Sequence, residues 1–591
     1  MQKELMEVTD QGSRPLSLKD RLKTPYYNAV LNEIHRHASI LNVNFWRINH
    51  ERTEIAGHIV DAGAIICAQL SALHINDELF KDHEEQRSTM ILQIIFTILL
   101  VWLFGRQFQK ASRLPPGPFA LPLIGNVPQI LYYAWKTGGI VPMLSQFRKK
   151  YGNVFTVWLG PLPTVSIADF DVAHEVMVKN GGKYADRFTP PTFNYFKEAG
   201  GIFLSNGIEW SEQRRFTLQV FRNLGMGKDA FEERIMDELN YRLAIMDKTA
   251  VDGVSVMKNS VLFDVTVGSI INRMLFNWRF ADDSEDFYKL KRTLDKSLEG
   301  FTPIELMLPM WMIKMFFKSR LEANRKIFDE VKDYVAKEAM ERLAKARRDE
   351  LVLTEESAQD FTDLFIVRIL NDEKNGIMST FTEENMREMV LDLWQTGQET
   401  TTLTLNSGFV NLMKHPEVVD RLRKELMEVT DQGSRPLSLK DRLKTPYYNA
   451  VLNEIQRHAS ILNVNFWRIN HERTEIAGHT VDAGAIICAQ LSALHTNDEL
   501  FKDHEKFNPD RFLEDATLGN KVIPFGIGKR SCLGEGMAKA ELYLIIGNIL
   551  LRYDIKPHGE LPDNMDKLPF SAVKVAPKVD IEFRRLEKIK C

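Results

Sequence analysis

The sequence predicts a mainly α-helical protein with small β-sheets, on the basis of two patterns. Leu321–Asp349 and Glu384–Lys414 keep a helical spacing of apolar residues over lengths that no strand reaches. Tyr151–Ile167 and Glu475–Leu491 have the composition of paired strands, and the second pair is expected to turn at Asp482-Ala-Gly484. The strands are too few for a large sheet, so the helices must supply most of the core.

Composition excludes several classes of protein. The chain has 591 residues, 44% of them apolar, and a formal net charge of −4, so it shows no sign of nucleic-acid binding. Four cysteines, at 67, 488, 532 and 591, have neither CxxC nor zinc-ligand spacing. A reducing compartment is therefore favoured over a disulfide-stapled secreted fold.

The beginning of the chain repeats a later part. Lys3–Glu84 recurs almost letter for letter as Lys424–Glu505, several hundred residues away, which excludes the short periods of solenoids and propellers. The copy stops before any counterpart of Cys532, and its elements would lack covering partners. We therefore interpret 1–89 as a partial duplicate or a gene-model fusion that is not an independent domain. A regulatory copy competing for the docking position of the later segment is the alternative.

The segment Met90–Gly105 is apolar almost throughout and approaches the length of about 20 residues that a membrane-crossing helix needs. Basic residues and the stiff Pro115–Pro118 follow it, a flank that predicts a cytosolic location for the rest of the chain. The sequence thus predicts a membrane anchor at 90–105, a basic, proline-rich hinge at 106–118 and a catalytic domain at 119–591. A buried core helix or a cleaved signal peptide is the alternative.

The most informative window is Phe525-Gly-Ile-Gly-Lys-Arg530-Ser-Cys532-Leu-Gly534. Its glycines allow positive φ and a close approach of the backbone to a flat macrocycle. The helical run Glu535–Leu551 follows at once, and a helix N-terminus favours the thiolate form of a cysteine. The window therefore predicts that Cys532 is the axial ligand of a haem iron and that Arg530 pairs with a haem propionate.

Two other interpretations of this window fail. A phosphate-binding loop needs a glycine at position 523, which is Ile. A lone cysteine is ordinarily a small buried hydrophobe, but the surrounding glycines and Arg530 argue against that role here.

Two helical spacings complement the cysteine loop. Trp210 and Arg214 lie four residues apart and share a helix face, so both side chains can reach one propionate. Glu454 and Arg457, three apart, also share a face. Either spacing alone is common in surface ion pairs, and neither is specific without Cys532.

Together these motifs, in this order, resemble the cytochrome P450 family, most closely its microsomal, drug- and lipid-oxidising animal members. The resemblance covers Met90–Cys591 and implies a P450-like fold, haem b as the cofactor and a haem-thiolate monooxygenase. It adds Thr396-Gly-Gln-Glu399-Thr400, where Glu399 would pass protons inward and Thr400 would hold a water beside bound dioxygen. Thr396 stands where the family usually has Ala or Gly.

The resemblance assigns further residues. Arg511 would join Glu454 and Arg457 in a buried structural arrangement behind the cysteine loop. Arg468 matches the position from which the family reaches the second propionate, although Asn463 and Trp467 stand where prolines are common. Variable stretches at Arg187–Phe196, Phe301–Phe317, the helix before Thr400 and Ile461–Val464 would choose the substrate.

The resemblance also implies partners and a location. The chain has no flavin or dinucleotide motif, so electrons would come from NADPH–cytochrome P450 reductase docking near Lys529, with cytochrome b5 as a second candidate donor. The substrate would be lipophilic: a xenobiotic, fatty acid, eicosanoid or steroid. The location would be the endoplasmic reticulum membrane, with Phe301–Phe317 dipping into the lipid. A haem-thiolate isomerase or dehydratase, or an inactive fusion product, is the alternative.

Overall fold

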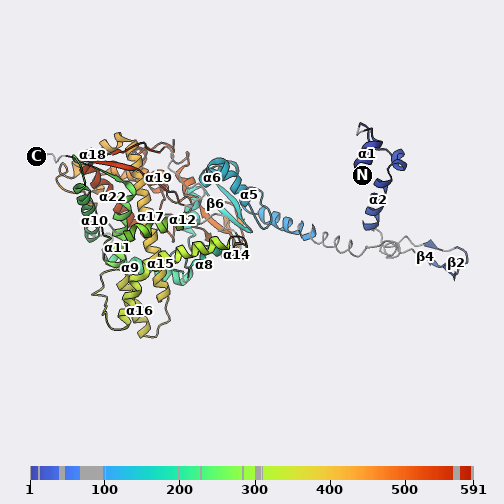
Figure 1. Cartoon of the computed structure of the whole chain (residues 1–591), viewed down its shortest axis with the longest axis horizontal. Helices are drawn as coiled ribbons and strands as arrows, with labels where there is room; N and C mark the ends of the chain where they lie inside the picture. Colours follow the sequence, from blue (N-terminus) through green and yellow to red (C-terminus); the bar gives the residue numbers. More distant parts are fainter. Residues whose placement is uncertain are drawn as a thin grey trace. The chain divides into compact units, whose positions relative to one another are not determined.

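The computed structural model describes residues 2–10, 13–38, 47–48, 50–66, 97–99, 101–197, 200–225, 229–281, 285–299, 308, 310–562 and 573–586. The chain forms two compact units, Met1–Arg106 and Gln107–Cys591 (Figure 1). Cys67, Cys591, half of the apolar segment at 90–105 and residues 301–307 lie outside the described residues.

The first unit repeats the local structure of the segment that it duplicates. Its elements are α1 (Gln2–Val8), η1 (Leu18–Lys23), α2 (Pro25–Ala38), β1 (Arg47–Ile48), β2 (Thr53–Ile55), β3 (His58–Val60) and β4 (Ile65–Ile66). β1 pairs antiparallel with β4, and β2 with β3. A capping box of Ser17 and Asp20 begins η1, as Ser438 and Asp441 do in the later copy. These elements depend on short-range interactions that both copies contain.

The two copies differ in what covers them. Ile34 is 55% exposed, whereas its counterpart Ile455 is fully buried against Gly408. Tyr26 is 60% exposed and its counterpart Tyr447 only 6%. The first copy therefore has its helices without the packing that buries them, which agrees with the expectation that the duplicate lacks covering partners.

The second unit is mainly helical, and the prediction of a helical fold with small sheets is confirmed. Its helices are α5 (Val127–Thr137), α6 (Ile140–Tyr151), α7 (Phe170–His174), α8 (Pro191–Phe196), α9 (Gly207–Asn223), α10 (Asp229–Lys248), α11 (Asn259–Phe276), α12 (Glu285–Glu299), α14 (Met310–Phe316), α15 (Lys318–Arg347), α16 (Phe361–Lys374), α17 (Glu383–Lys414), α18 (Pro416–Val429), α19 (Pro446–Ala459), α20 (Leu491–His495), α21 (Arg511–Glu514) and α22 (Glu535–Arg552). Shorter helical turns are η2 (Glu175–Lys179), η3 (Leu439–Lys444) and η4 (Ala516–Lys521).

Three small sheets accompany these helices. A four-stranded sheet has the order β5-β6-β11-β8, in which only the β6–β11 pair is parallel. A second sheet has the order β12-β13-β7, and β9 pairs with β10 in a hairpin. The strands are β5 (Val154–Leu159), β6 (Leu162–Ile167), β7 (Val254–Lys258), β8 (Arg468–Ile469), β9 (Thr474–Ile476), β10 (His479–Val481), β11 (Ile486–Ala489), β12 (Tyr553–Pro557) and β13 (Asp580–Arg585).

Helix α17 runs through the core of this unit and touches α11, α15, α19 and α22 (Figure 1). It begins where the Thr382 side chain caps the amide of Asn385, and it ends at His415, before Pro416. Most of its side chains are buried, including Trp394 and Phe409. Exposed residues in the middle of α17 consequently mark a place where no other described segment covers the helix.

Two details differ from the sequence-based expectation. The β9–β10 hairpin turns at Ala477 and Gly478, both with positive φ, and Asp482–Gly484 instead separates β10 from β11, which lies in another sheet. Part of the expected hinge at 106–118 belongs to the folded unit. Leu114 is buried, and the Pro116 carbonyl accepts a hydrogen bond of 2.9 Å from the amide of Thr156 in β5.

Among the residues that the structure describes, no helix combines the length and the apolar character needed to cross a membrane. Half of the expected anchor at 90–105 lies outside that description, so the anchor stays a prediction.

The repeat provides a matched test of core packing. Ile455→Ala removes a fully buried side chain from the α17–α19 contact and should lower the free energy of unfolding by about 2–5 kcal/mol. Ile34→Ala truncates the same residue in the exposed copy and should change stability by less than about 0.5 kcal/mol. Urea denaturation of both variants measures the difference, and equal losses would contradict the burial described above.

Candidate functional site

The glycine-rich loop before α22 folds back on itself to present Cys532. The amide of Cys532 donates to the Phe525 carbonyl over 2.9 Å, and the amide of Ser531 donates to the Gly528 carbonyl over 3.0 Å. Gly528 has a φ of 81°, and a Cβ there would lie 1.9 Å from the carbonyl oxygen of Met177. Glycine is therefore required at this point, as the sequence predicts.

Cys532 is the one cysteine of the described residues whose side chain is open. Cys488 is buried, and its Sγ lies 2.9 Å from the Asn465 carbonyl oxygen. The Cys532 thiol is exposed, and yet enough protein surrounds it that burial raises its pKa. Its side chain is thus accessible, although protein surrounds it closely.

In this structure the helix N-terminus is not the main influence on the pKa of the Cys532 sulfur. Burial raises the pKa of Cys532 above the ordinary value, and this outweighs the lowering by the Gly534 amide and by the charge of Arg214. The sulfur is consequently a thiol unless a metal ion binds it, because coordination deprotonates a cysteine outright.

Four arginines gather beside this loop. Arg530 precedes Cys532 by two residues, and Arg214 in α9 donates from Nη2 to the Ser531 carbonyl over 2.9 Å. Arg468, in β8, is almost fully buried. Arg187 forms an antiparallel bridge with Arg468, so the backbone itself holds these two residues side by side. We call Arg187, Arg214, Arg468 and Arg530 the arginine cluster.

The arginine cluster contains unused donors. None of its members forms an ion pair with a carboxylate of the described residues, and Arg187 Nε, Arg468 Nη1 and Arg530 Nη1 are buried without a hydrogen-bond partner. Arg530 does donate to the Ala185 and Ser205 carbonyls, both over 2.7 Å. Buried guanidinium groups are ordinarily paired. The free donors therefore fit a ligand that brings carboxylates of its own.

The pKa values in the cluster agree with this interpretation. Burial, with the charge of Arg468 as the second cause, lowers the pKa of Arg530 to about 9. Burial likewise lowers the pKa of Arg468 to about 10. Burial is also the main cause of the strongly lowered pKa of Arg187, with Arg468 and Arg530 contributing. An anion in their midst would relieve both the desolvation and the mutual repulsion.

Trp210 lies beside the arginine cluster and contacts one of its members. Its ring is stacked under the Arg530 guanidinium, with 3.9 Å between the Arg530 Cζ and the ring centroid. Arg214 lies farther from that ring, at 6.0 Å. The pair expected from the WxxxR spacing is brought to the loop by α9, and Trp210 there supports Arg530.

Arg187 is a member that sequence analysis placed only in a variable stretch. Its guanidinium lies between the rings of Phe203 and Phe466, with 4.4 and 5.2 Å from Cζ to the centroids. Its contact with Arg468 joins segments far apart in the chain. No local spacing in the sequence could therefore reveal that Arg187 belongs to the cluster. Only its strand bridge to a distant segment shows this.

The middle of α17 is open on one side. Thr396 is exposed and Thr400 half-buried, although the helix around them is buried. The Thr400 hydroxyl donates to the Thr396 carbonyl over 2.8 Å, and Thr404 repeats this bond one turn later, to the Thr400 carbonyl. At Thr396 and Thr400, therefore, other described segments do not fully cover the helix.

Glu399 faces away from that opening and is paired with a lysine that sequence analysis missed. Lys291 of α12 places its Nζ 3.1 Å from a carboxylate oxygen of Glu399, and it also contacts Asp295. Burial raises the pKa of Glu399 to about 7, while the Lys291 charge lowers it. A carboxyl group that titrates near neutral pH can both accept and release protons under physiological conditions.

The Glu454–Arg457–Arg511 arrangement has the expected geometry. Arg457 Nε lies 2.7 Å from Glu454 Oε2, and Arg511 Nε lies 3.3 Å from Oε1. All three side chains are buried. Arg457 also donates to the His495 carbonyl over 2.9 Å, and the His495 ring accepts the amide of Ile523, two residues before the cysteine loop.

Comparison with known proteins shows the family to which the chain belongs. The cytochrome P450 family model matches residues 1–86 and 115–583. The chain is 44% identical to "Probable cytochrome P450 cyp-35D1" of Caenorhabditis elegans over 82% of this chain and 98% of the relative. It is 30% identical to "Cytochrome P450 2C23" of Rattus norvegicus and 31% to "Cytochrome P450 2G1" of Oryctolagus cuniculus, covering 95% of each and 82% and 81% of this chain.

The chain therefore belongs to the cytochrome P450 family, whose members bind haem b and act as monooxygenases. The residues present fit this cofactor, since an open cysteine lies beside buried arginine donors that lack a counter-anion. A thiolate-ligated haem supplies oxygen activation when it is bound.

The Glu399–Lys291 pair predicts a pH-dependent stability. Lys291→Met removes the cation that lowers the pKa of Glu399, so this pKa should rise above about 7, and the pKa of Asp264 should rise with it. A carboxyl whose folded-state pKa lies above its unfolded value destabilises the protein as pH increases. The variant should thus lose more stability at pH 8 than at pH 5, measured by urea denaturation. Lys291→Arg keeps the charge and is the control; an equal loss at both pH values would contradict the pairing.

Proposed function

We propose that this cytochrome P450 is a monooxygenase of lipophilic small molecules in the endoplasmic reticulum membrane, supplied with electrons by NADPH–cytochrome P450 reductase. The observation that carries the proposal is the open Cys532 beside the arginine cluster, whose free donors suit the two propionates of haem b. Cys532 is the proposed axial ligand, and Trp210, Arg214, Arg468 and Arg530 hold the cofactor.

The proposed oxygen-side residues are Glu399 and Thr400. Glu399 is buried, with a pKa near 7, and so can take up a proton from the Lys291 side of α17. Thr400 follows it in the chain and lies on the open face of the helix, where its hydroxyl can hold a water. The role proposed for the pair is to deliver protons while excluding bulk solvent.

The proposed membrane contact rests on α14. Trp311, Met315 and Phe316 are 60–63% exposed on this helix, while Ile313 is buried against the unit. An exposed apolar surface of this kind favours contact with lipid. It supports a lipophilic substrate that enters from the membrane, together with an anchor at 90–105.

The proposed reductase surface lies beside the cysteine loop. Lys529 is exposed, and Lys539 lies over the ring of Phe525, 5.5 Å from Nζ to the centroid. Lys539 also lines a hollow with Arg442 and Leu443, and Leu443 is 97% exposed. Positive charge around an exposed apolar side chain suits an acidic electron-donor protein, and cytochrome b5 would use the same surface.

The CO difference spectrum of the reduced protein tests the thiolate ligand directly. The wild type, as the full chain and from Met90, should show a red-shifted Soret band. Cys532→Ala should abolish it, and Cys67→Ala, in the duplicate, should leave it unchanged. A band that survives Cys532→Ala, or is absent from both wild-type forms, would refute the proposal.

Thr400→Ala should keep haem binding but divert electrons from NADPH to hydrogen peroxide, because the hydroxyl on the open face is lost. We expect the peroxide fraction to rise at least about threefold in a reductase-coupled assay. Thr404→Ala is the matched control, since Thr404 makes the same bond to the carbonyl four residues earlier. Equal coupling in both variants would remove Thr400 from the mechanism. Peroxide rearrangement without reductase would favour an isomerase.

A further inference from the structure

Four charged side chains are buried where α8 ends between α15 and α17. Lys197 Nζ lies 2.6 Å from Asp392 Oδ1 and 3.3 Å from Glu388 Oε2. Lys332 Nζ lies 3.5 Å from Glu388 Oε1. Each side chain is at most 8% exposed. We call Lys332, Glu388, Lys197 and Asp392 the charge ladder.

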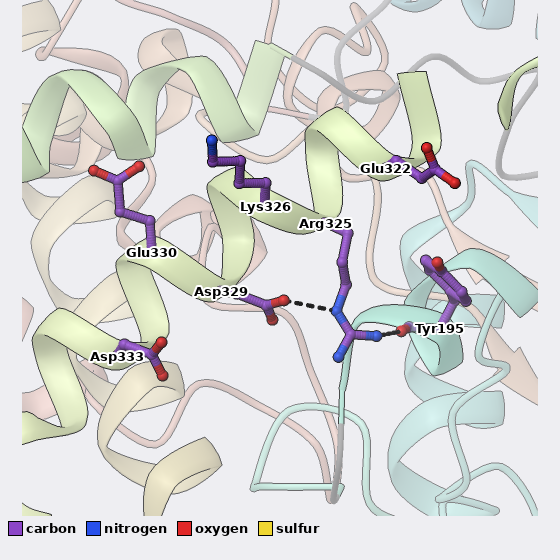
Figure 2. A pocket seen from close by; sticks show the side chains of 7 residues that line it. All are labelled: Tyr195, Glu322, Arg325, Lys326, Asp329, Glu330 and Asp333. Carbon is purple, nitrogen blue, oxygen red and sulfur yellow. Dashed lines mark hydrogen bonds and ion pairs between the residues drawn. The ribbon is translucent and has the colours of Figure 1, made fainter. Parts of the chain in front are cut away.

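The charge ladder extends to the surface. Lys332 lies 3.8 Å from Asp329, which Arg325 contacts over 2.9 Å. Arg325 also donates to the Tyr195 carbonyl in α8, so that one side chain ties α8 to α15 (Figure 2). A hollow of about 490 Å³ lies here, lined by Tyr195, Glu322, Arg325, Lys326, Asp329, Glu330 and Asp333.

Stability alone does not account for the charge ladder. Desolvating two lysines and two carboxylates is costly, and apolar side chains of similar volume often stabilise a core as well or better. Lys197 nonetheless keeps its positive charge. Burial lowers its pKa, but the attraction of the two carboxylates outweighs this effect and raises the pKa overall. What the ladder provides is a fixed geometry at its inner end.

At its inner end the charge ladder contacts a loop. Asp392 Oδ2 accepts the amides of Ile202 and Phe203, over 3.0 and 2.9 Å. Gly201 makes the approach possible: it has a φ of 57°, and a Cβ there would lie 2.3 Å from Asp392 Oδ2. The position of the loop at 201–206 is thus set by a carboxylate on α17 and by the cation that holds this carboxylate.

The same loop is hydrogen-bonded to two members of the arginine cluster. Arg187 donates to the Phe203 carbonyl and lies over the Phe203 ring. Asn206 Oδ1 accepts the amide of Arg187 and the Nη2 of Arg530, both over 2.8 Å. A shift of this loop would therefore move both guanidinium groups.

We propose that the charge ladder is a positioning device for the cofactor: through the loop at 201–206 it holds Arg187, and with it Arg530, at the propionate site. The inference rests on the proposed haem site. Lys197 is the key positioning residue, since it joins the two carboxylates of α17, and none of the four ladder residues touches the cofactor site itself. Specific recognition of a cofactor depends on such supporting contacts.

Lys197→Met tests this with a readout that needs no haem. Hydrogen exchange of the Ile202 and Phe203 amides in the full chain without haem should become about tenfold faster, because Asp392 loses the cation that fixes it. Lys197→Arg should restore protection. The matched control is Arg242→Met, which removes a buried cation from Glu238, 2.7 Å away, in the α10–α11 region. It should destabilise the protein without changing exchange at 202–203.

The second readout is the rate of haem transfer from the holoprotein to an excess of apomyoglobin. Lys197→Met should release haem about tenfold faster, as loss of a supporting contact typically does. The double variant with Lys197→Met and Arg187→Met should release haem no faster than Arg187→Met alone if the ladder acts through Arg187. Arg242→Met should not change the rate.

The outcomes separate the two proposals. Three results would overturn the inference even where the CO spectrum shows thiolate ligation. Hydrogen exchange at Ile202 and Phe203 could be unchanged in Lys197→Met, or Lys197→Met and Arg242→Met could have equal effects. The third is that the effects of Lys197→Met and Arg187→Met on the rate of haem transfer add up. A wild type that binds haem without that spectrum refutes the proposed function alone, and the exchange and transfer rates still decide the role of the ladder. A wild type that binds no haem overturns both.

Discussion

The folded unit is organised around four neighbouring guanidinium groups that form no ion pair with a carboxylate of the described residues. Burial, together with neighbouring arginines, lowers the pKa of Arg187, Arg468 and Arg530, and each of these three keeps a buried nitrogen without a hydrogen-bond partner. Such an arrangement is unfavourable unless a ligand brings negative charge. The haem propionates would supply this negative charge, so the arginine cluster is suited to bind them. The cluster lies beside Cys532, the one exposed cysteine of the described residues.

Much of the surrounding structure serves to hold this arrangement. The bridge between Arg187 and Arg468 joins the first third of the chain to the four-stranded sheet. Asn206 and the Ser205 carbonyl fix Arg530, and the buried charges between α15 and α17 fix the loop that contains them. On the other side, Arg457 and His495 connect α19 to the beginning of the cysteine loop. Each support is buried and hydrogen-bonded, so the site is formed in advance and need not be assembled by the ligand.

Sequence alone revealed the parts of this site that are local. Cys532, Arg530 and the glycines lie in one window, and Trp210 with Arg214 or Glu454 with Arg457 share a helix face, so spacing was enough. Arg187, Lys291 and Lys197 could not be found in this way, since their partners lie in distant segments. The effect of burial on the pKa of the Cys532 thiol could not be predicted either, because it depends on packing that no motif encodes. The duplicate illustrates the same limit: identical residues form identical turns and helices, but Ile34 is exposed where Ile455 is buried.

The most direct test of the account compares haem with its dimethyl ester, in which both propionates are uncharged. If the arginine cluster requires the propionates, the full chain without haem should bind the ester at least about tenfold more weakly than haem. Neutralising Arg187 and Arg530 together by Arg→Met should reduce this difference, since fewer cations then discriminate between the two. Equal affinity of the wild type for haem and for the ester, measured by absorbance titration, would contradict the account.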